Sequence, residues 1–331
     1  MNYIEREKLK RLEEKFSLNF RVTRMFTEYL ERYPEIIKRE MIEELTADGE
    51  LTKREAVCAL LSELFALDFN KPDDRRIILD YIGQSVRILD TEKYTSNPYY
   101  RYIAPEAVRD GDWEFRWEYY PPYRAAIADD MIMKDDYTEI PPLGFFTEGF
   151  SFPAVLEGGN EWMTITPVDV DTVTEAIADA RGKVITFGLG LGYYAYMVSQ
   201  KANVESVTVV EKSEKVIELF RRHILPKFPN GDKVRIISAD AFSYAENEMP
   251  TEGYDYAFVD TWRDASDGLP MYERMKALEH LSPKTEFSYW IEKFILSRKR
   301  ALRFDELMRA VERDDEGAPE SYDDFIKKLA E

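Results

Sequence analysis

Apolar residues recur at helical spacing through the first third of the chain. In its first helical stretch they fall at Ile4, Leu9, Leu12 and Phe16. Thr52 and Glu55 match the capping-box pattern that precedes an apolar helical run. Pro72 is placed to begin a further helix that continues through Ile88. The pattern therefore predicts a helical N-terminal region over residues 1–95.

Between residues 96 and 168 the period changes to that of strands. Aromatic residues alternate with charged ones over 113–119. The apolar runs 150–156 and 162–165 flank a turn that contains two glycines, which predicts a hairpin. The tetrapeptide 97–100, Asn-Pro-Tyr-Tyr, is interpreted as a turn. We expect a small β-rich subdomain over 96–168.

From residue 169 onward, strand-type and helical segments alternate. Asp169 or Asp171 is placed to cap a helix that runs to Ala180. Strands are expected at 183–187, 207–211, 234–238, 254–260 and 286–290. Helices are expected at 193–201, at 214–223, at 270–281 and from about residue 292. This alternation predicts an α/β domain with a parallel sheet over 169–331.

The first strand of this domain runs into three glycines on alternate positions, Gly188, Gly190 and Gly192. Glycine lets the backbone turn sharply and approach a ligand closely. The helix that follows presents free N–H groups at its start. The spacing is GxGxG, whereas dinucleotide folds favour GxGxxG. The segment predicts a site for a nucleotide-like ligand.

Acidic residues end or follow the next three strands. Glu211 closes the second strand, and an acid there can accept hydrogen bonds from both hydroxyls of a ribose. Asp240 follows the third strand and Asp260 ends the fourth. The carboxyl ends of parallel strands share one edge of the sheet, where ligands bind at the point at which the strand order reverses. We expect the glycines and these acids to line one site.

Residues 183–262 resemble a class I S-adenosylmethionine (SAM)-dependent methyltransferase, and the order of features is similar to that of the spermidine synthase branch. The resemblance implies that the three glycines border the amino-acid part of SAM and that Glu211 holds the ribose. It implies that Asp240 bonds the adenine amino group, with Phe242 near the ring. Asp260 would face the reacting centre and is the candidate catalytic residue.

The fold implied is α/β, a Rossmann-like methyltransferase sheet preceded by the helical region and the small β subdomain. Two features depart from the family pattern. Thr186 stands where many members carry an acid. The residues after the fifth strand are few and helical, so we expect a sheet without the usual last hairpin.

Composition narrows the class of partner. The 331 residues contain 45 Lys plus Arg and 64 Asp plus Glu, a net charge of −19. Such a surface repels phosphate backbones and anionic lipid, which disfavours nucleic acid as a partner. It mildly favours a small cation, but a solvated acidic surface that aids solubility explains the charge more simply. One cysteine, Cys58, and two histidines argue against a disulfide and a His/Cys metal site. No apolar signal core or membrane-length stretch is visible, so a cytoplasmic protein is expected.

Three functions are compatible with these patterns. The first is methyl transfer from SAM to a small-molecule or peptide-borne acceptor, in which Asp260 orients or deprotonates an amine nucleophile. Alignment of the acceptor with the activated methyl group supplies much of such catalysis. The second is aminopropyl transfer from decarboxylated SAM to a polyamine, which Thr186 disfavours. The third is a non-catalytic SAM-binding or assembly module.

Overall fold

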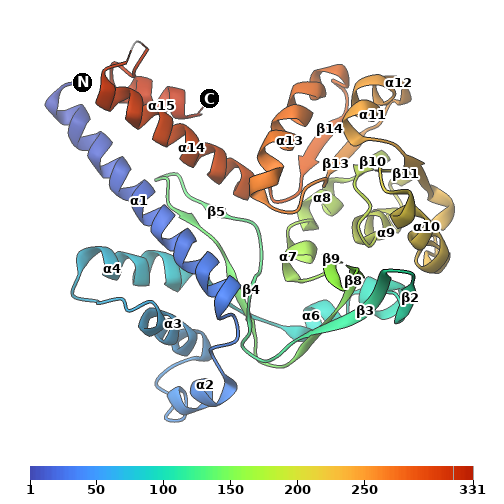
Figure 1. Ribbon diagram of the computed structural model, residues 1–331, viewed down its shortest axis with the longest axis horizontal. Coiled ribbons are helices and arrows are strands. Elements are labelled where there is room, and N and C mark those ends of the chain that lie inside the picture. The colour runs from blue at the N-terminus through green and yellow to red at the C-terminus, as the bar shows by residue number, and fades with distance from the viewer. Residues whose placement is uncertain (316, 331) are drawn as a thin grey trace. The chain divides into compact units, whose positions relative to one another are not determined.

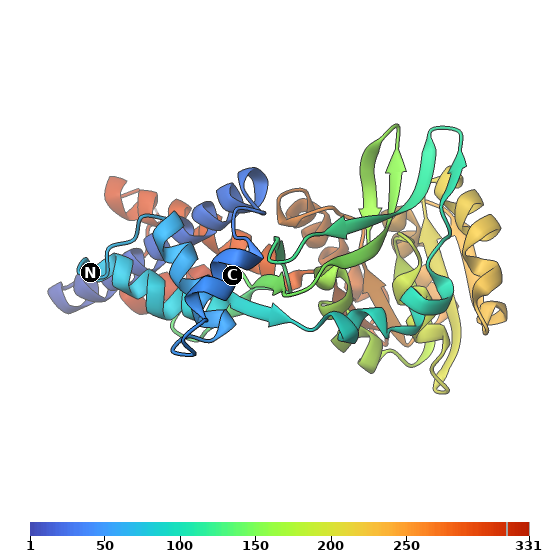
Figure 2. The same cartoon turned by 90° about the horizontal axis from the view of Figure 1, so that it is seen from below.

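A computed structural model describes residues 1–315 and 317–330. Their contacts divide the chain into two compact units (Figures 1 and 2). The first unit combines Met1–Ile88, Tyr123–Phe145 and the described residues from Lys293 onward. The second unit combines Leu89–Pro122 and Phe146–Glu292.

Helices make up most of the first unit. They are α1 (Tyr3–Arg32), α2 (Arg39–Leu45), α3 (Lys53–Leu64), α4 (Pro72–Arg76), the π-helix η1 (Ile77–Ile82), α5 (Gly83–Ser85), α14 (Glu292–Arg313) and α15 (Tyr322–Ala330). The capping box predicted ahead of α3 is confirmed, because the Thr52 hydroxyl accepts from the Glu55 N–H and the Glu55 carboxylate accepts from the Thr52 N–H. No helix in the described part of the chain is both long enough and apolar enough to cross a bilayer.

Packing at the end of the chain explains why the compact units differ from the predicted segments 1–95, 96–168 and 169–331. Phe304 of α14 stacks on Phe16 of α1, with 4.0 Å between ring centroids, and Phe325 of α15 is fully buried in the same cluster. These long-range apolar contacts join the last helices to the first one. Sequence order alone does not reveal such contacts.

Short strands complete the first unit. They are β1 (Val86–Leu89), β4 (Ala125–Ile127) and β7 (Leu143–Phe146) in one sheet, ordered β1-β7-β4, and β5 (Ile132–Met133) with β6 (Glu139–Ile140) in another. The expected helix through Ile88 is wrong, since the chain becomes extended at Val86. The apolar residues of β1 instead pair with β7, so tertiary contacts override the helical pattern there.

A five-stranded parallel sheet forms the centre of the second unit. Its strands are β10 (Gly182–Phe187), β11 (Val204–Glu211), β12 (Val234–Ser238), β13 (Tyr256–Val259) and β14 (Glu286–Tyr289). They are ordered β12-β11-β10-β13-β14, and every pairing is parallel. This order is that of a Rossmann-like sheet, with its switch point between β10 and β13. The predicted α/β class is confirmed at this level, and within the described residues no strand follows β14.

Helices cover both faces of this sheet (Figure 1). They are α8 (Thr174–Asp179), α9 (Tyr193–Ser199), α10 (Glu214–His223), α11 (Ala241–Asn247), α12 (Met249–Glu252) and α13 (Ala265–Leu278), with 3₁₀ segments η3 (Leu225–Lys227), η4 (Gly231–Lys233) and η5 (Glu279–Leu281). The helix α13 begins five residues before the expected Pro270, because Asp264 caps it and Pro270 lies inside its first turns.

An antiparallel sheet ordered β2-β3-β8-β9 lies in the same unit. Its strands are β2 (Val108–Asp110), β3 (Trp113–Tyr120), β8 (Phe150–Glu157) and β9 (Asn160–Thr164), and the segments α6 (Thr91–Thr95), η2 (Tyr99–Ile103) and α7 (Pro167–Asp171) flank it. The predicted hairpin is confirmed as β8–β9. Trp113 and Phe115 bury their rings in the core that also contains Phe220 of α10, so this sheet packs beside the glycine-rich edge.

Candidate functional site

The loop between β10 and α9 carries the three glycines, all with positive φ: 101° at Gly188, 51° at Gly190 and 77° at Gly192. At two of them, contacts within the protein exclude a side chain. A Cβ at Gly188 would lie 1.9 Å from the carbonyl oxygen of Asp260, and one at Gly192 would lie 2.2 Å from the Phe220 ring. These glycines bring β10 against the end of β13 and α9 against α10.

Gly190 faces a different neighbour, the side chain of Met163 on β9. A Cβ at Gly190 would lie 2.9 Å from Met163 Cε and 3.4 Å from its sulfur. The space that a ligand would need for close approach to this backbone is therefore occupied by a thioether.

Glu211, at the end of β11, turns its carboxylate toward the glycine loop. Its Oε2 accepts from the Leu189 N–H at 3.2 Å, and its Oε1 accepts from the Ser213 N–H at 2.7 Å. A carboxylate offers about four acceptor positions, so these two bonds leave capacity for further donors. Its role as the ribose ligand stays a prediction.

Asp240 and Phe242 lie at the neighbouring strand end. Asp240 is exposed and caps α11 by accepting from the Ser243 N–H at 3.0 Å. Phe242 is buried, and the Arg274 guanidinium lies over its ring at 4.2 Å from the centroid. One face of the ring is thus already covered by a cation, and the adenine contact expected for these two residues stays a prediction.

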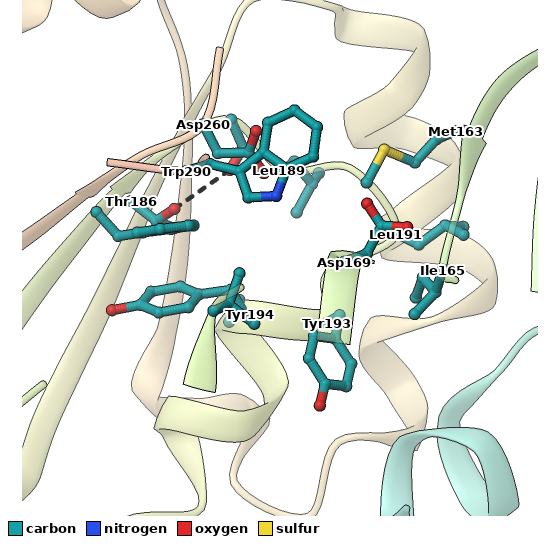
Figure 3. A pocket seen from close by; sticks show the side chains of 14 residues that line it. Met163, Ile165, Asp169, Thr186, Leu189, Leu191, Tyr193, Tyr194, Asp260 and Trp290 are labelled. Atoms are coloured by element: carbon teal, nitrogen blue, oxygen red, sulfur yellow. Dashed lines mark hydrogen bonds between the residues drawn. The ribbon is translucent and has the colours of Figure 1, made fainter. Parts of the chain in front are cut away.

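A pocket opens at the carboxyl ends of β10 and β13 (Figure 3). It is lined by Met163, Ile165, Asp169, Val173, Thr186, Gly188, Leu189, Leu191, Tyr193, Tyr194, Ala195, Phe258, Asp260 and Trp290. Its volume is about 30 Å³, enough for roughly two waters and far below the 300 Å³ or more of typical ligand sites. Of the predicted site residues, Gly188 and Asp260 line it. The others do not: Gly190, Gly192, Glu211, Asp240 and Phe242.

The two carboxylates of this pocket are unusually basic. Burial, together with the negative charges of Asp169 and Glu211, raises the pKa of Asp260 to about 8. Burial also raises the pKa of Asp169 to about 6, against hydrogen bonds from Thr166 that lower it. Among the residues that the structure describes, no basic side chain lines the pocket. A site of this kind favours a cation, which would stabilise both charged carboxylates.

The acids of the following loop do not add to this site. Asp264 and Asp267 form a capping box at the start of α13, and Arg263 pairs with Asp267 at 3.3 Å. These contacts exclude two structural roles for Asp260, as the cap of the next helix and as the partner of Arg263. Within the described residues no hydrogen bond or ion pair engages its carboxylate, and no group of three or more His, Cys, Asp or Glu is arranged for a metal.

The expectation that Asp169 or Asp171 is the cap residue of the helix is wrong, and Asp171 instead accepts from the Lys93 ammonium and the Tyr94 hydroxyl. Thr166 is the cap residue of α7, and Asp169 accepts from its N–H and hydroxyl, both at 2.8 Å. The expected single helix to Ala180 is also divided into α7 and α8. The capping box holds the Asp169 side chain at the start of α7, where it lines the pocket.

Other contacts around the glycine loop have no signal in the sequence. The Asn97 amide donates to the Tyr193 hydroxyl at 2.8 Å, and the Tyr99 hydroxyl donates to the Leu191 carbonyl. The interpretation of 97–100 as a turn is wrong for Tyr99 and Tyr100, which begin the π-helix η2, and this segment fixes the far side of the loop. Trp290, at the end of β14, donates to the Thr172 hydroxyl at 3.1 Å. These residues carry no motif, and only the fold brings them together.

No protein-family model matches the chain, and no curated protein matches it significantly. Among solved structures, the chain is similar to a spermidine synthase from Thermotoga maritima, with 14% sequence identity and a TM-score of 0.32. The match covers 60% of this chain and 63% of that chain, so it spans less than two thirds of that protein. The Rossmann-like assignment therefore rests on the strand order and parallel pairing of the chain itself.

Proposed function

We propose that the second unit binds SAM at the carboxyl ends of β10, β11 and β13 and transfers its methyl group to an acceptor that carries an amine. One observation supports this most. A glycine loop and two buried acids meet at the switch point of a parallel sheet, and no basic residue described around the pocket neutralises these acids. SAM carries a positive sulfonium, and an amine acceptor is itself cationic before it reacts. Both cations would be attracted by the carboxylates at this edge of the sheet.

Each residue of the proposed site would have a distinct role. The spare acceptor positions of Glu211 would take the ribose hydroxyls. Asp260, with a pKa near 8, would take the proton of an ammonium acceptor and leave a neutral nucleophile. The sulfonium already activates the methyl group, so orientation by Asp169 and the aromatic walls would supply much of the remaining effect.

A non-catalytic module is the second candidate, and one observation favours it. The pocket holds only about 30 Å³, and Met163 lies on Gly190. A chain that kept the fold for assembly would need no larger cavity.

Calorimetric titration with SAM, decarboxylated SAM and NAD tests the ligand class, and transfer of labelled methyl from SAM to a panel of amines tests turnover. We expect heat of binding with SAM and labelled product with at least one amine. Binding of SAM without turnover on any amine would favour the module. Preference for decarboxylated SAM would favour aminopropyl transfer, and binding of none of the three would refute the proposal.

A further inference from the structure

The hairpin β8–β9 covers the one glycine of the loop that no rigid part of the protein requires. Gly188 packs on backbone and Gly192 on a buried ring, but Gly190 meets only the far end of the flexible Met163 side chain. Figure 3 shows this thioether reaching into the pocket between the loop and Asp169. The contact is one that a side-chain or hairpin movement can release.

The space beneath the hairpin is too small for a nucleoside. Beside the pocket of about 30 Å³, a second cavity of about 10 Å³ lies between Gly190, Trp113 and Trp162. Each holds at most a few waters. A ligand that contacts the Gly190 backbone therefore requires Met163 to leave.

The strand that carries Met163 is suited to movement. β9 is an edge strand that pairs only with β8. The pairing skips Trp162, because Val155 pairs with Met163 while Leu156 pairs with Glu161, which makes Trp162 the extra residue of a β-bulge. Bulges interrupt the ladder and are frequent next to active sites. The Gly158 N–H ties the start of the turn to the Asp112 carbonyl at 2.7 Å, whereas Asn160, Glu161 and Trp162 of β9 are exposed, so the movement belongs to β9.

We propose that β9, the exposed edge strand of the β8–β9 hairpin, is a movable cover of the nucleoside site, closed by Met163 on Gly190 and opened when SAM binds, while β8 stays paired with β3. This inference rests on the proposed function, since SAM is the ligand that opens the cover. Such a cover explains why a sheet edge that binds SAM has almost no free volume in this structure, because the closed state dominates when no ligand is bound. The apparent affinity for SAM is then the affinity of the open state multiplied by the fraction of molecules that are open.

The test compares wild-type protein with Met163→Ala in calorimetric titration and stopped-flow binding of SAM, with intrinsic tryptophan fluorescence as the signal. The chain has five tryptophans. Trp162 packs edge-on against Trp113 at 5.3 Å between ring centroids, so the part of the signal that is lost in Trp162→Phe reports movement of β9. We expect Met163→Ala to bind SAM roughly fivefold more tightly and to associate faster, because the closed state loses its contact. Met163→Val, which suits a strand, replaces it if the alanine variant does not fold.

Met197→Ala is the matched control. Met197 is also partly buried against the core of this unit and lines neither cavity. It should bind SAM as the wild type does. Unchanged or weaker binding by both Met163 variants would overturn the cover and leave SAM binding standing. Absence of SAM binding in every variant would overturn the proposed function and the cover together.

Discussion

At the scale of single residues, the glycine loop shows three different reasons for the same residue type. Gly188 is required by the carbonyl of Asp260, Gly192 by the ring of Phe220, and Gly190 by nothing more rigid than Met163. The sequence predicted the loop but assigned all three glycines to the ligand. Packing partners from β13 and α10 are distant in sequence, so their demand on Gly188 and Gly192 could not be foreseen.

Substitution of Gly188 should therefore cost far more than left-handed backbone strain alone. Gly253 is the matched control, since it has φ of 69° and no described atom within 4 Å of the position of a Cβ, against φ of 101° and a backbone clash at Gly188. We expect Gly253→Ala to lower the free energy of unfolding by about 1–2 kcal/mol. Gly188→Ala should lower it by more than about 3 kcal/mol, because backbone must move. Equal losses of unfolding free energy for the two variants, measured by urea unfolding, would contradict a close contact between Gly188 and the Asp260 carbonyl.

The raised pKa of Asp260 has a consequence for stability. A carboxyl with a pKa near 8 in the folded state and about 4 when unfolded binds its proton more tightly when folded. Its contribution favours the fold below pH 4 and is lost as the pH rises toward 8. Asp260→Asn removes the charge, so it should raise the free energy of unfolding by roughly 1–3 kcal/mol at pH 8.5 relative to wild type.

At about pH 4 the same variant should show no such gain, because the Asp260 carboxyl of the folded wild type is then protonated and uncharged. Denaturant unfolding at the two pH values measures the difference. Glu205→Gln, which changes an exposed side chain at the opposite end of β11, is the matched control and should change the free energy of unfolding by no more than about 0.5 kcal/mol. A pH-independent effect of Asp260→Asn would mean that its carboxyl is not basic.

At the scale of elements, local patterns located the five strands of the parallel sheet with small errors, but they predicted no helix at η2, α11 or α12. The larger misses have identifiable causes. The start of α13 moved because Asp264 forms a capping box, a signal that outweighs Pro270. The strand β1 replaced the end of a helix because β7 supplied a pairing partner. Periodicity predicts an element in isolation and cannot include a partner that arrives from a distant part of the sequence.

The contact between α14 and α1 gives an element-scale prediction. Phe304 is 5% exposed and stacks on Phe16, so Phe304→Ala removes a large buried ring. We expect a loss of about 3 kcal/mol or more in the free energy of unfolding. Leu302→Ala, in the same helix and 53% exposed, should change it by no more than about 0.5 kcal/mol. Similar small effects of both variants would show that α14 does not depend on this contact.

At the scale of the whole molecule, the sequence predicted the α/β class and missed how the chain is shared between the units. The first unit takes residues from both ends of the chain and from 123–145. Such an interleaved division depends on contacts of high sequence separation, which composition and periodicity do not encode. The net charge of −19 fits a small cationic ligand and disfavours nucleic acid, and both remain proposals about partners.

The most direct test of the proposed SAM site is calorimetric titration of SAM into wild-type protein, Glu211→Gln and Glu205→Gln. Both substitutions remove one carboxylate from β11, but only Glu211 lies at the end with the glycine loop. Wild type and Glu205→Gln should bind SAM equally, and Glu211→Gln should bind it roughly 10- to 100-fold more weakly, as expected for lost hydrogen bonds to a charged group. Equal affinity in all three proteins, or no binding by the wild type, would contradict a nucleoside held at this edge.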